Sequence, residues 1–409
     1  MNTKFQNFFY YIFFFWLAGV EQFIVTPFYL LITYFRSKKF KISTITIPIC
    51  VIIIFMTFSI VNISDTTKLF QLLRNIYSYV GALLVLSYHY FHSSKIYNSH
   101  YDFLKLIYFS SFIICFSGFL PILGINIFYE TPLYKFASND FLKNFFYKTF
   151  ADPNSGLFFI EGFVRPKGLM LFPNELSQIV VINLVIGLYL KNIKKLSPYI
   201  FMAFFLISLI VLVSTLSRGS WIALLFSFIV VQTIKSIMKK SISLNLVYSI
   251  LGLIIVTYFF NFFDIIISRF EGGHSNAGRI SNYMNSVTMT FDSLWTIFFG
   301  HGSQLDFYNY QKTQKLGSHS TYIGLLFKYG IFAFLSYVSF QIILLKKIFS
   351  SFNQKTINER KFILYTQIII ISIVHSIFYD LDVDMNVMLF YFAIFGFIAS
   401  QTNENQINT

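Results

Sequence analysis

Residues 199–234, YIFMAFFLISLIVLVSTLSRGSWIALLFSFIVVQTI, decide the fold class of this chain. Two apolar runs, 199–215 and 219–234, flank a short polar turn that contains Arg218. Because about 17–25 apolar residues cross the ~30 Å hydrocarbon core of a bilayer, the pair predicts a transmembrane hairpin. An arginine costs roughly 2.5–3.5 kcal/mol at the bilayer centre, but little at the headgroups, where it can meet phosphate. Arg218 is therefore either an anchor for a helix end or part of a site for an anion.

The composition excludes an ordinary soluble domain, since 56% of the residues are hydrophobic and only 12% are charged. The net charge of +14 falls mostly in short Lys/Arg clusters beside apolar runs. That pattern orients a multi-pass membrane protein, so we predict no nucleic-acid partner. Cys50 and Cys115 both lie inside apolar runs, and no disulfide is predicted.

Apolar runs of membrane-spanning length recur along the chain and predict an all-α, polytopic membrane helix bundle that forms one domain over residues 1–409. The first run, 8–35, is interrupted by Glu21, Gln22 and Pro27, so it is one long pass or two short ones, and the total is 11 or 12. It is too long for a cleavable signal peptide and lacks a small-residue cleavage site. The other predicted passes are 44–62, 75–92, 104–124, 175–190, 199–215, 219–234, 244–261, 319–345, 362–379 and 386–400.

The Lys/Arg clusters predict the orientation of the bundle. With the passes above, four clusters fall on one side, which we expect to be the cytoplasm, together with the C-terminus. They are Arg36, Lys38, Lys39 and Lys41; Lys191, Lys194 and Lys195; Lys235, Lys239 and Lys240; and Lys346, Lys347, Lys355, Arg360 and Lys361.

This topology leaves two long segments, 125–174 and 262–318, on the outer side. Connections of this length are usually functional or disordered. The first segment is rich in aromatic residues between Phe128 and Phe150, which suits the membrane interface. In the second, an apolar stripe predicts a helix lying on the membrane: Ile280, Tyr283, Met284, Val287 and Phe291, with Ser275 or Asn276 as its N-cap. Both segments are therefore expected to be structured, with short helices lying on the bundle.

Four polar residues are predicted at one depth on the outer side: Arg165, Arg218, Arg279 and His319. Arginine binds phosphate in a bidentate fork, and a histidine that titrates near neutrality can take a proton from a hydroxyl. The cluster therefore suits an anionic, membrane-bound ligand.

Each of these residues also has an ordinary structural explanation. Arg165 could pair with Glu161, Arg279 could be a solvated residue of the surface helix, and His319 could cap its helix. Gly300 and Gly302 make a turn by default, because no strand and no glycine-rich fingerprint accompany them. The run Asp380, Asp382 and Asp384 lies between two passes and predicts a short solvated turn. No zinc-ligand spacing occurs, and we predict no metal site.

The order of the motifs resembles the bacterial O-antigen ligase/polymerase family. The motifs are Arg165-x-x-Gly168 to Pro173-Asn174, then Thr215-x-Ser217-Arg218-Gly219, then Arg279 before Gly300-x-Gly302, then Ser318-His319 with Gly330 further on. The resemblance covers roughly residues 160–335. Two positions depart from the family pattern: Ser320 replaces an asparagine that often follows the histidine, and the acidic residue that is common near Lys328 is absent.

The resemblance implies an inverting, metal-independent glycosyltransferase in the bacterial cytoplasmic (inner) membrane, with no cofactor. The donor would be a glycan on undecaprenyl pyrophosphate at the outer face of that membrane. Arg218 and Arg279 would hold the pyrophosphate leaving group, and His319 would orient or deprotonate the acceptor hydroxyl, with Glu175 as the alternative base. The implied substrate-binding residues are Arg165, Asn174, Ser217, Gly300 and Gly302.

Three activities remain open at this point. A polymerase of O-antigen, capsule or similar surface polysaccharide, which we favour, extends the chain onto the next lipid-linked repeat unit. A ligase transfers finished glycan to lipid A core, as in lipopolysaccharide, or to a protein. A flippase for lipid-linked oligosaccharide is disfavoured, because nearly all charges lie at the ends of the predicted passes. Expected partners are the lipid-linked oligosaccharide, membrane lipid and a chain-length regulator.

Overall fold

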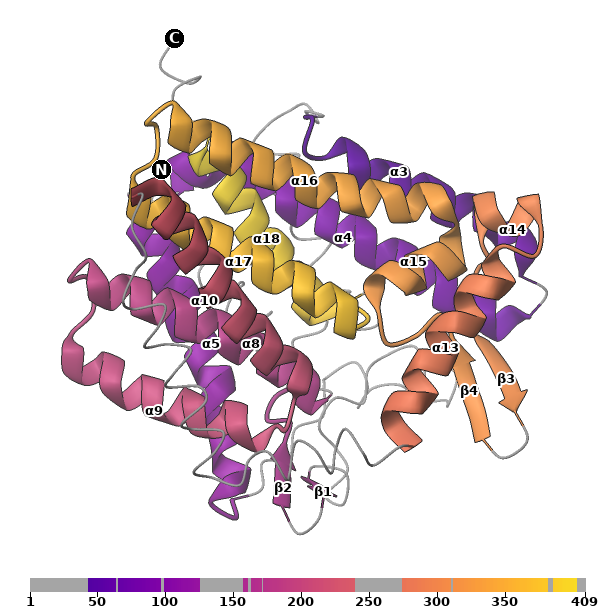
Figure 1. The fold of residues 1–409 in the computed structure, drawn as a ribbon, viewed down its shortest axis with the longest axis horizontal. Coiled ribbons are helices and arrows are strands. Elements are labelled where there is room, and N and C mark those ends of the chain that lie inside the picture. Colours follow the sequence, from indigo (N-terminus) through magenta and orange to yellow (C-terminus); the bar gives the residue numbers. More distant parts are fainter. Residues whose placement is uncertain are drawn as a thin grey trace.

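The computed structural model describes residues 43–63, 65–96, 99–125, 157–160, 163–170, 172–239, 274–309, 312–381 and 385–402. Long helices dominate this part of the chain (Figure 1). The apolar ones are α3 (Ile47–Phe58, followed by the 3₁₀ turn η1, Ser59–Asn62), α4 (Thr66–Ile96), α5 (His100–Ile122), α8 (Pro173–Asn192), α9 (Pro198–Ser214), α10 (Arg218–Lys239), α16 (Ile331–Asn353), α17 (Glu359–Phe378) and α18 (Met385–Gln401). The shorter elements are α13 (His274–Thr290), α14 (Leu294–Phe299), α15 (Thr321–Tyr329), β1 (Leu157–Ile160), β2 (Phe163–Pro166), β3 (Leu305–Asn309) and β4 (Lys312–Leu316).

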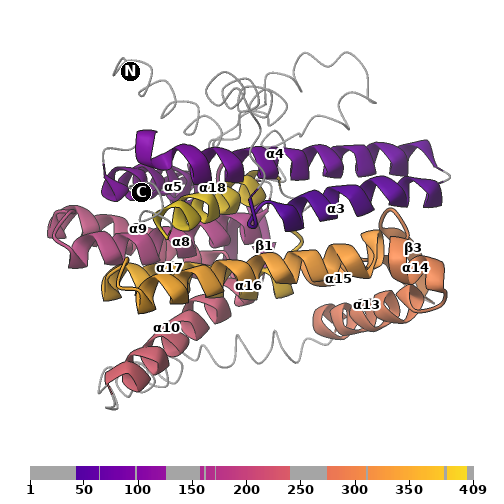
Figure 2. The same cartoon turned by 90° about the horizontal axis from the view of Figure 1, so that it is seen from above.

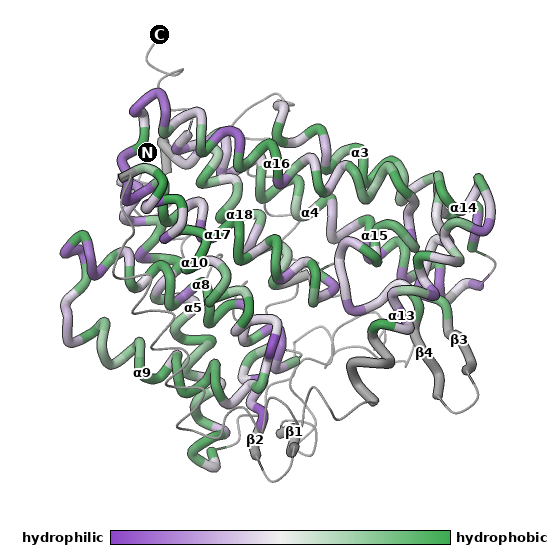
Figure 3. Tube along the Cα trace, in the orientation of Figure 1, coloured by the Kyte–Doolittle hydropathy of each residue, from purple (hydrophilic) through white to green (hydrophobic). Residues whose placement is uncertain are grey.

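The apolar helices coincide with the predicted passes, except at the predicted pass 319–345. Within the described residues, α4, α5, α8, α10, α16 and α17 are long and apolar enough to cross a membrane, and α3, α9 and α18 are shorter apolar helices. Hydrophobic residues run along these helices, while hydrophilic residues gather at their ends (Figure 3). The predicted class, an all-α polytopic membrane bundle, is thus confirmed. The runs 8–35 and 244–261 lie outside the described residues, so the total of 11 or 12 passes stays a prediction.

Helix α8 lies at the centre of the bundle. In its most apolar window 89% of the residues are buried, against 17% for α10. At mid-length the buried Asn183 donates from Nδ2 to the Tyr108 carbonyl and to Ser111 Oγ, both at 2.7 Å, and accepts from Ser208 Oγ at 3.2 Å. A polar group inside hydrocarbon must find protein partners, so this cluster fixes α5, α8 and α9 against one another.

The predicted pass 319–345 has the wrong boundaries. Two helices replace it, α15 and α16, and they meet at Gly330. Gly330 has φ +85°, and a Cβ there would lie 2.1 Å from the Phe298 carbonyl oxygen. Hydropathy does not register this break, because glycine interrupts a helix by its backbone geometry and leaves the apolar pattern unchanged.

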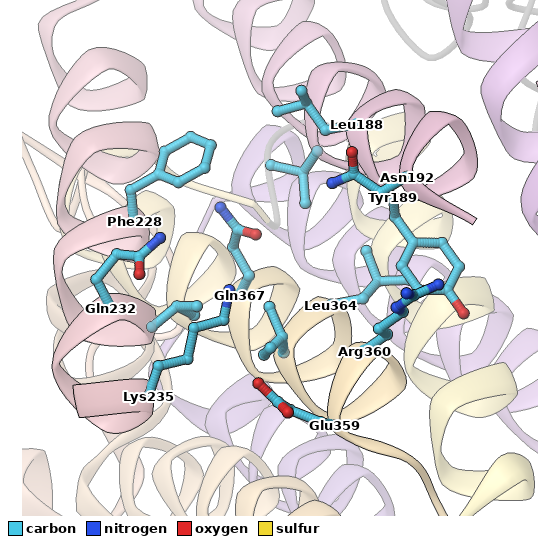
Figure 4. A pocket seen from close by; sticks show the side chains of 13 residues that line it. Leu188, Tyr189, Asn192, Phe228, Gln232, Lys235, Glu359, Arg360, Leu364 and Gln367 are labelled. Carbon is cyan, nitrogen blue, oxygen red and sulfur yellow. The ribbon is translucent and has the colours of Figure 1, made fainter. Parts of the chain in front are cut away.

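Three of the predicted basic clusters meet at one end of the bundle. Lys235 near the end of α10 and Arg360 at the start of α17 line one pocket with Tyr189 and Asn192 at the end of α8, and Figure 4 shows these side chains around it. Glu359 contributes a carboxylate to the same pocket. The shared end agrees with the predicted orientation. The fourth cluster, Arg36 to Lys41, lies outside the described residues, and so does Lys240.

The two long segments contribute to the other end. Their described parts contain helices α13 and α14, as expected, and also two antiparallel β-hairpins, β1–β2 and β3–β4, which the helical expectation did not include. In β1–β2, Phe158 pairs with Arg165. Figure 2 shows α3 and α4 along one side of the bundle, with α10 and α13 on the opposite side. The aromatic stretch from Phe128 to Phe150 lies outside the described residues.

Helix α13 turns its polar side to the protein. Asn282, Ser286 and Thr290 are at most 4% exposed, whereas Ile280 and Met284 are 60% and 66% exposed. The buried residues are spaced four apart and therefore form one face, which packs on α15 and β4. Ile280, Met284 and Phe291 of the predicted apolar stripe thus face away from the protein, as expected for a helix that rests on the membrane, whereas Tyr283 and Val287 are half-buried.

Candidate functional site

The turn between α9 and α10 places Arg218 at the first position of α10. Leu216 in this turn has φ +50°, a left-handed conformation that is uncommon for a residue with a side chain. Ser217, 2% exposed, forms a hydrogen bond between its hydroxyl and that of Tyr379, just after α17. A Cβ at position 219 would lie 2.6 Å from the Tyr379 hydroxyl oxygen, so Gly219 lets the two segments approach.

Arg165 joins three segments of the site. From strand β2 its Nε donates to the Thr215 carbonyl at 2.7 Å, and its Nη2 donates to Asn174 Oδ1 at 3.2 Å. Ser177, one turn after Asn174 in α8, forms a 2.7 Å hydroxyl–hydroxyl bond with Ser220. The structure thus brings together three predicted residues, Arg165, Asn174 and Ser217. Glu161, the alternative partner of Arg165, lies outside the described residues.

Glu175 lies in the first turn of α8 and is 5% exposed. Its Oε2 accepts a hydrogen bond from the Phe172 backbone N–H at 3.1 Å. A carboxylate in the first turn satisfies a backbone donor that lacks a helical partner and meets the positive end of the helix dipole. Glu175 therefore stabilises the start of the helix that carries Asn174, and its role as a base stays a prediction.

His319 precedes α15 in a constrained backbone. Its φ is +69°, its side chain is exposed, and its carbonyl accepts from the Tyr283 hydroxyl at 2.7 Å. Tyr283 belongs to α13, the helix that also contains Arg279 one turn earlier. The segments of His319 and Arg279 are thus in contact. The side chain of Arg279 lies outside the described residues.

Tyr379 connects the His319 segment to the Arg218 turn. Thr321 donates to the Tyr379 carbonyl from its backbone N–H at 2.8 Å and from its hydroxyl at 2.7 Å. The Tyr379 hydroxyl bonds Ser217 on the other side. No sequence motif distinguishes this residue among the 27 tyrosines, because its role depends on contacts with segments far away in the chain.

Asp380 corrects the prediction of a solvated turn. Its Oδ1 lies 3.6 Å from Lys328 Nζ, and the two side chains are 9% and 2% exposed. The Gln304 amide donates to its Oδ2 at 3.3 Å. Lys328 has no acidic neighbour in the sequence, but the fold brings Asp380, just after α17, next to it. Asp382 and Asp384 lie outside the described residues.

Gly300 and Gly302 place their turn against the end of α15. Their φ angles are +66° and +76°, and a Cβ on Gly300 would lie 2.4 Å from backbone atoms of Lys328. The His301 and Gly302 N–H groups donate to the carbonyls of Phe327 at 2.8 Å and Lys328 at 2.7 Å. Both glycines therefore allow a close backbone contact, and their contact with substrate stays a prediction.

Burial lowers the pKa of His301 from its ordinary value of 6.5, against the opposing effects of the Met289 carbonyl and Asp292. Its ring stacks on Phe327 with 4.4 Å between the centroids. His301 is therefore mainly uncharged at neutral pH, and its part in this turn is packing. In the described part of the chain, no group of three or more His, Cys, Asp or Glu is arranged to hold a metal ion.

These features define a class: a polytopic α-helical membrane protein with a polar site at one end of its bundle. Residues 203–338 match the protein family described as O-antigen ligase. The matched stretch contains Ser217, Arg218, Arg279, Gly300, Gly302 and His319, whereas Arg165, Asn174 and Glu175 precede it. This match supports the resemblance to the O-antigen ligase/polymerase family that the order of the motifs predicted. No curated protein matches the chain.

Proposed function

We propose that this protein is a surface-polysaccharide polymerase at the outer face of a bacterial cytoplasmic membrane. The match of residues 203–338 to the O-antigen ligase family supports ligase/polymerase-type activity and a glycosyltransferase-like chemistry. The donor in our proposal is a glycan on undecaprenyl pyrophosphate, and the acceptor is a hydroxyl of the next lipid-linked repeat unit. The observation that carries the proposal is the contact network around Tyr379, which joins the turn of Arg218 to the segment of His319.

The proposed reaction is an inverting displacement. The acceptor hydroxyl attacks the anomeric carbon while the bond from that carbon to the pyrophosphate oxygen breaks. His319 takes the hydroxyl proton, a role that contributes roughly 10²–10⁴-fold to a rate. Arg218 and Arg279 stabilise the charge that develops on the pyrophosphate, and losing one such contact commonly costs about 3 kcal/mol.

Arg165 has a positioning role in this proposal. Its guanidinium donates to the Thr215 carbonyl, and so holds the turn that carries Arg218. It also fixes Asn174 at the start of the central helix α8. Because α8 is the most enclosed of the candidate spans, the turn is attached to a rigid support.

The ligase alternative is favoured by one observation, the description of the matching family as O-antigen ligase. Deletion of the gene, followed by electrophoresis of the surface polysaccharide, separates the activities. Loss of a polymerase leaves single repeat units attached to the core, and loss of a ligase leaves none attached. Loss of a flippase stops export, and that pattern would contradict a transferase.

Complementation with Arg218→Lys tests the role of the arginine. The charge is kept but the bidentate fork is lost, so we expect most of the polymer to disappear. Arg360→Lys, at the opposite end of the bundle, is the matched control and should restore full-length polymer. Full-length polymer from Arg218→Lys at normal expression would reduce Arg218 to an interfacial anchor.

A further inference from the structure

A second polar cavity of about 200 Å³ lies beside the Gly300–Gly302 turn, and Arg218 is not among the residues that line it. Helix α4 forms one wall, and the other walls come from the turn after α14 and from α15. The lining residues are Gln71, Leu72, Arg74, Asn75, Gly302, Ser303, Gln304 and Lys328. The predicted orientation places this end of α4 on the same outer side as residues 300–304.

The cavity is cationic. Arg74 and Lys328 both line it, and Asp380, which pairs with Lys328, is the carboxylate behind it. Lys328 is 1% exposed, and burying an ammonium is expensive unless a counter-charge or a ligand compensates it. The described residues that line the cavity thus carry two positive charges and no carboxylate, and the side-chain amides of Gln71, Asn75 and Gln304 add hydrogen-bond donors.

The walls of the cavity are held together by contacts on each side. Asn75 Nδ2 donates to the Tyr329 hydroxyl at 2.8 Å, which ties α4 to the end of α15. The Gly302 N–H donates to the Lys328 carbonyl at 2.7 Å. A Cβ on Gly302 would lie 2.8 Å from the Ser59 carbonyl, so the turn also rests on η1. Contacts within the protein thus hold together the segments that carry Arg74 and Lys328.

We propose that this cavity binds the pyrophosphate of the acceptor's lipid carrier. The inference rests on the proposed polymerase function, in which both substrates are lipid-linked and each brings its own pyrophosphate to the outer face. One set of cations cannot serve both groups at once. The cavity volume suits a phosphate or diphosphate and excludes a whole repeat unit, so the acceptor glycan would extend from it toward His319.

Binding stoichiometry tests this assignment. The purified protein in lipid nanodiscs is titrated with geranylgeranyl pyrophosphate, and the number of bound molecules is measured by calorimetry. We expect two sites in the unmodified protein. Arg74→Gln should weaken one of them at least tenfold, and Arg218→Lys should weaken the other. Lys68→Gln removes a positive charge from α4 outside the cavity lining and should keep both sites.

Each result decides between support and refutation. One site in the unmodified protein, or two unaltered sites in Arg74→Gln, would overturn the assignment. Equal binding of inorganic pyrophosphate, or preference of the Arg74 site for lipid A phosphates, would overturn the lipid-carrier part of it. The proposed polymerase function is tested separately, by electrophoresis of the surface polysaccharide. A ligase pattern together with two prenyl-pyrophosphate sites would refute the polymerase function and still support the assignment of the cavity as a pyrophosphate site. Arg74→Gln is preferred to a Lys328 variant, because loss of Lys328 leaves Asp380 without its buried counter-charge.

Discussion

At the scale of single residues, the site combines ordinary chemistry with an unusual backbone. Leu216 and His319 both have positive φ angles, and they belong to the two segments that Tyr379 joins. A left-handed residue with a Cβ costs roughly 1–2 kcal/mol, and such strain is found preferentially at functional sites. The surrounding contacts, above all the bond from Tyr283 to the His319 carbonyl, hold this conformation.

The backbone of His319 separates its structural role from its chemical role. Asn accepts a left-handed conformation readily and cannot act as a base at neutral pH, so His319→Asn should lose polymer while its thermal unfolding temperature is unchanged or higher. His319→Ala should lose polymer and also about 1 kcal/mol of stability. Normal polymer from His319→Asn would exclude the imidazole as the base and leave Glu175 as the candidate.

The lowered pKa of His301 predicts a dependence of stability on pH. The folded protein resists protonating this ring, while the unfolded chain binds the proton near pH 6.5, so stability should fall as the pH drops below that value. Unfolding temperatures in detergent at pH 7.5 and 5.5 measure the loss. His301→Gln should show a smaller loss, and an equal loss would assign the effect to other groups.

At the scale of elements, the ends of helices contribute the residues of the site, and contacts at the middle of the helices hold the helices in place. The starts of α8, α10 and α15 and the end of α17 contribute Asn174, Arg218, Thr321 and Tyr379. The buried Asn183 fixes α8 to its neighbours at mid-length. The side chains at the ends can therefore be held by a few hydrogen bonds.

Gly219→Ala tests the contact between α10 and the end of α17. The added methyl would lie 2.9 Å from Phe378 Cβ, which cannot turn aside as the end of a flexible side chain can. We expect the Ser217–Tyr379 bond to break and activity to fall at least tenfold, although no charged residue changes. Gly124→Ala is not a suitable control, because Gly124 has φ +79° and alanine would be strained there. The control is Ala223→Gly, a substitution within α10 itself. Full activity of Gly219→Ala would show that the contact is dispensable.

At the scale of the whole molecule, the positions of the basic clusters predict the orientation. At one end of the bundle, Lys235, Arg360 and the end of α8 line the pocket of Figure 4. Helix α13 and both hairpins lie toward the other end of the bundle. Reporter fusions at Lys195 and Lys347 should therefore read cytoplasmic, and a fusion at Asn276 should read periplasmic. The reverse pattern would place the site on the wrong face for the proposed lipid-linked donor.

The sequence by itself determined the class of the protein and most of the described passes, and the order of its motifs predicted the family that residues 203–338 match. Each of these depends on local properties, since hydropathy over about 20 residues decides whether a segment crosses a bilayer, and motif order is independent of folding. The same local view did not detect the break at Gly330 or the two β-hairpins, because backbone geometry and strand pairing do not alter hydropathy.

Only the tertiary structure decided which polar residues act together. Tyr379 and Asp380 follow a pass near the end of the sequence; no motif marks Tyr379, and the acidic run that contains Asp380 predicted only a solvated turn. They meet Ser217, Thr321 and Lys328 because the end of α17 is packed between the starts of α10 and α15. A polar residue near a membrane must find its partners in space, and helix packing chooses those partners from segments that the sequence keeps far apart.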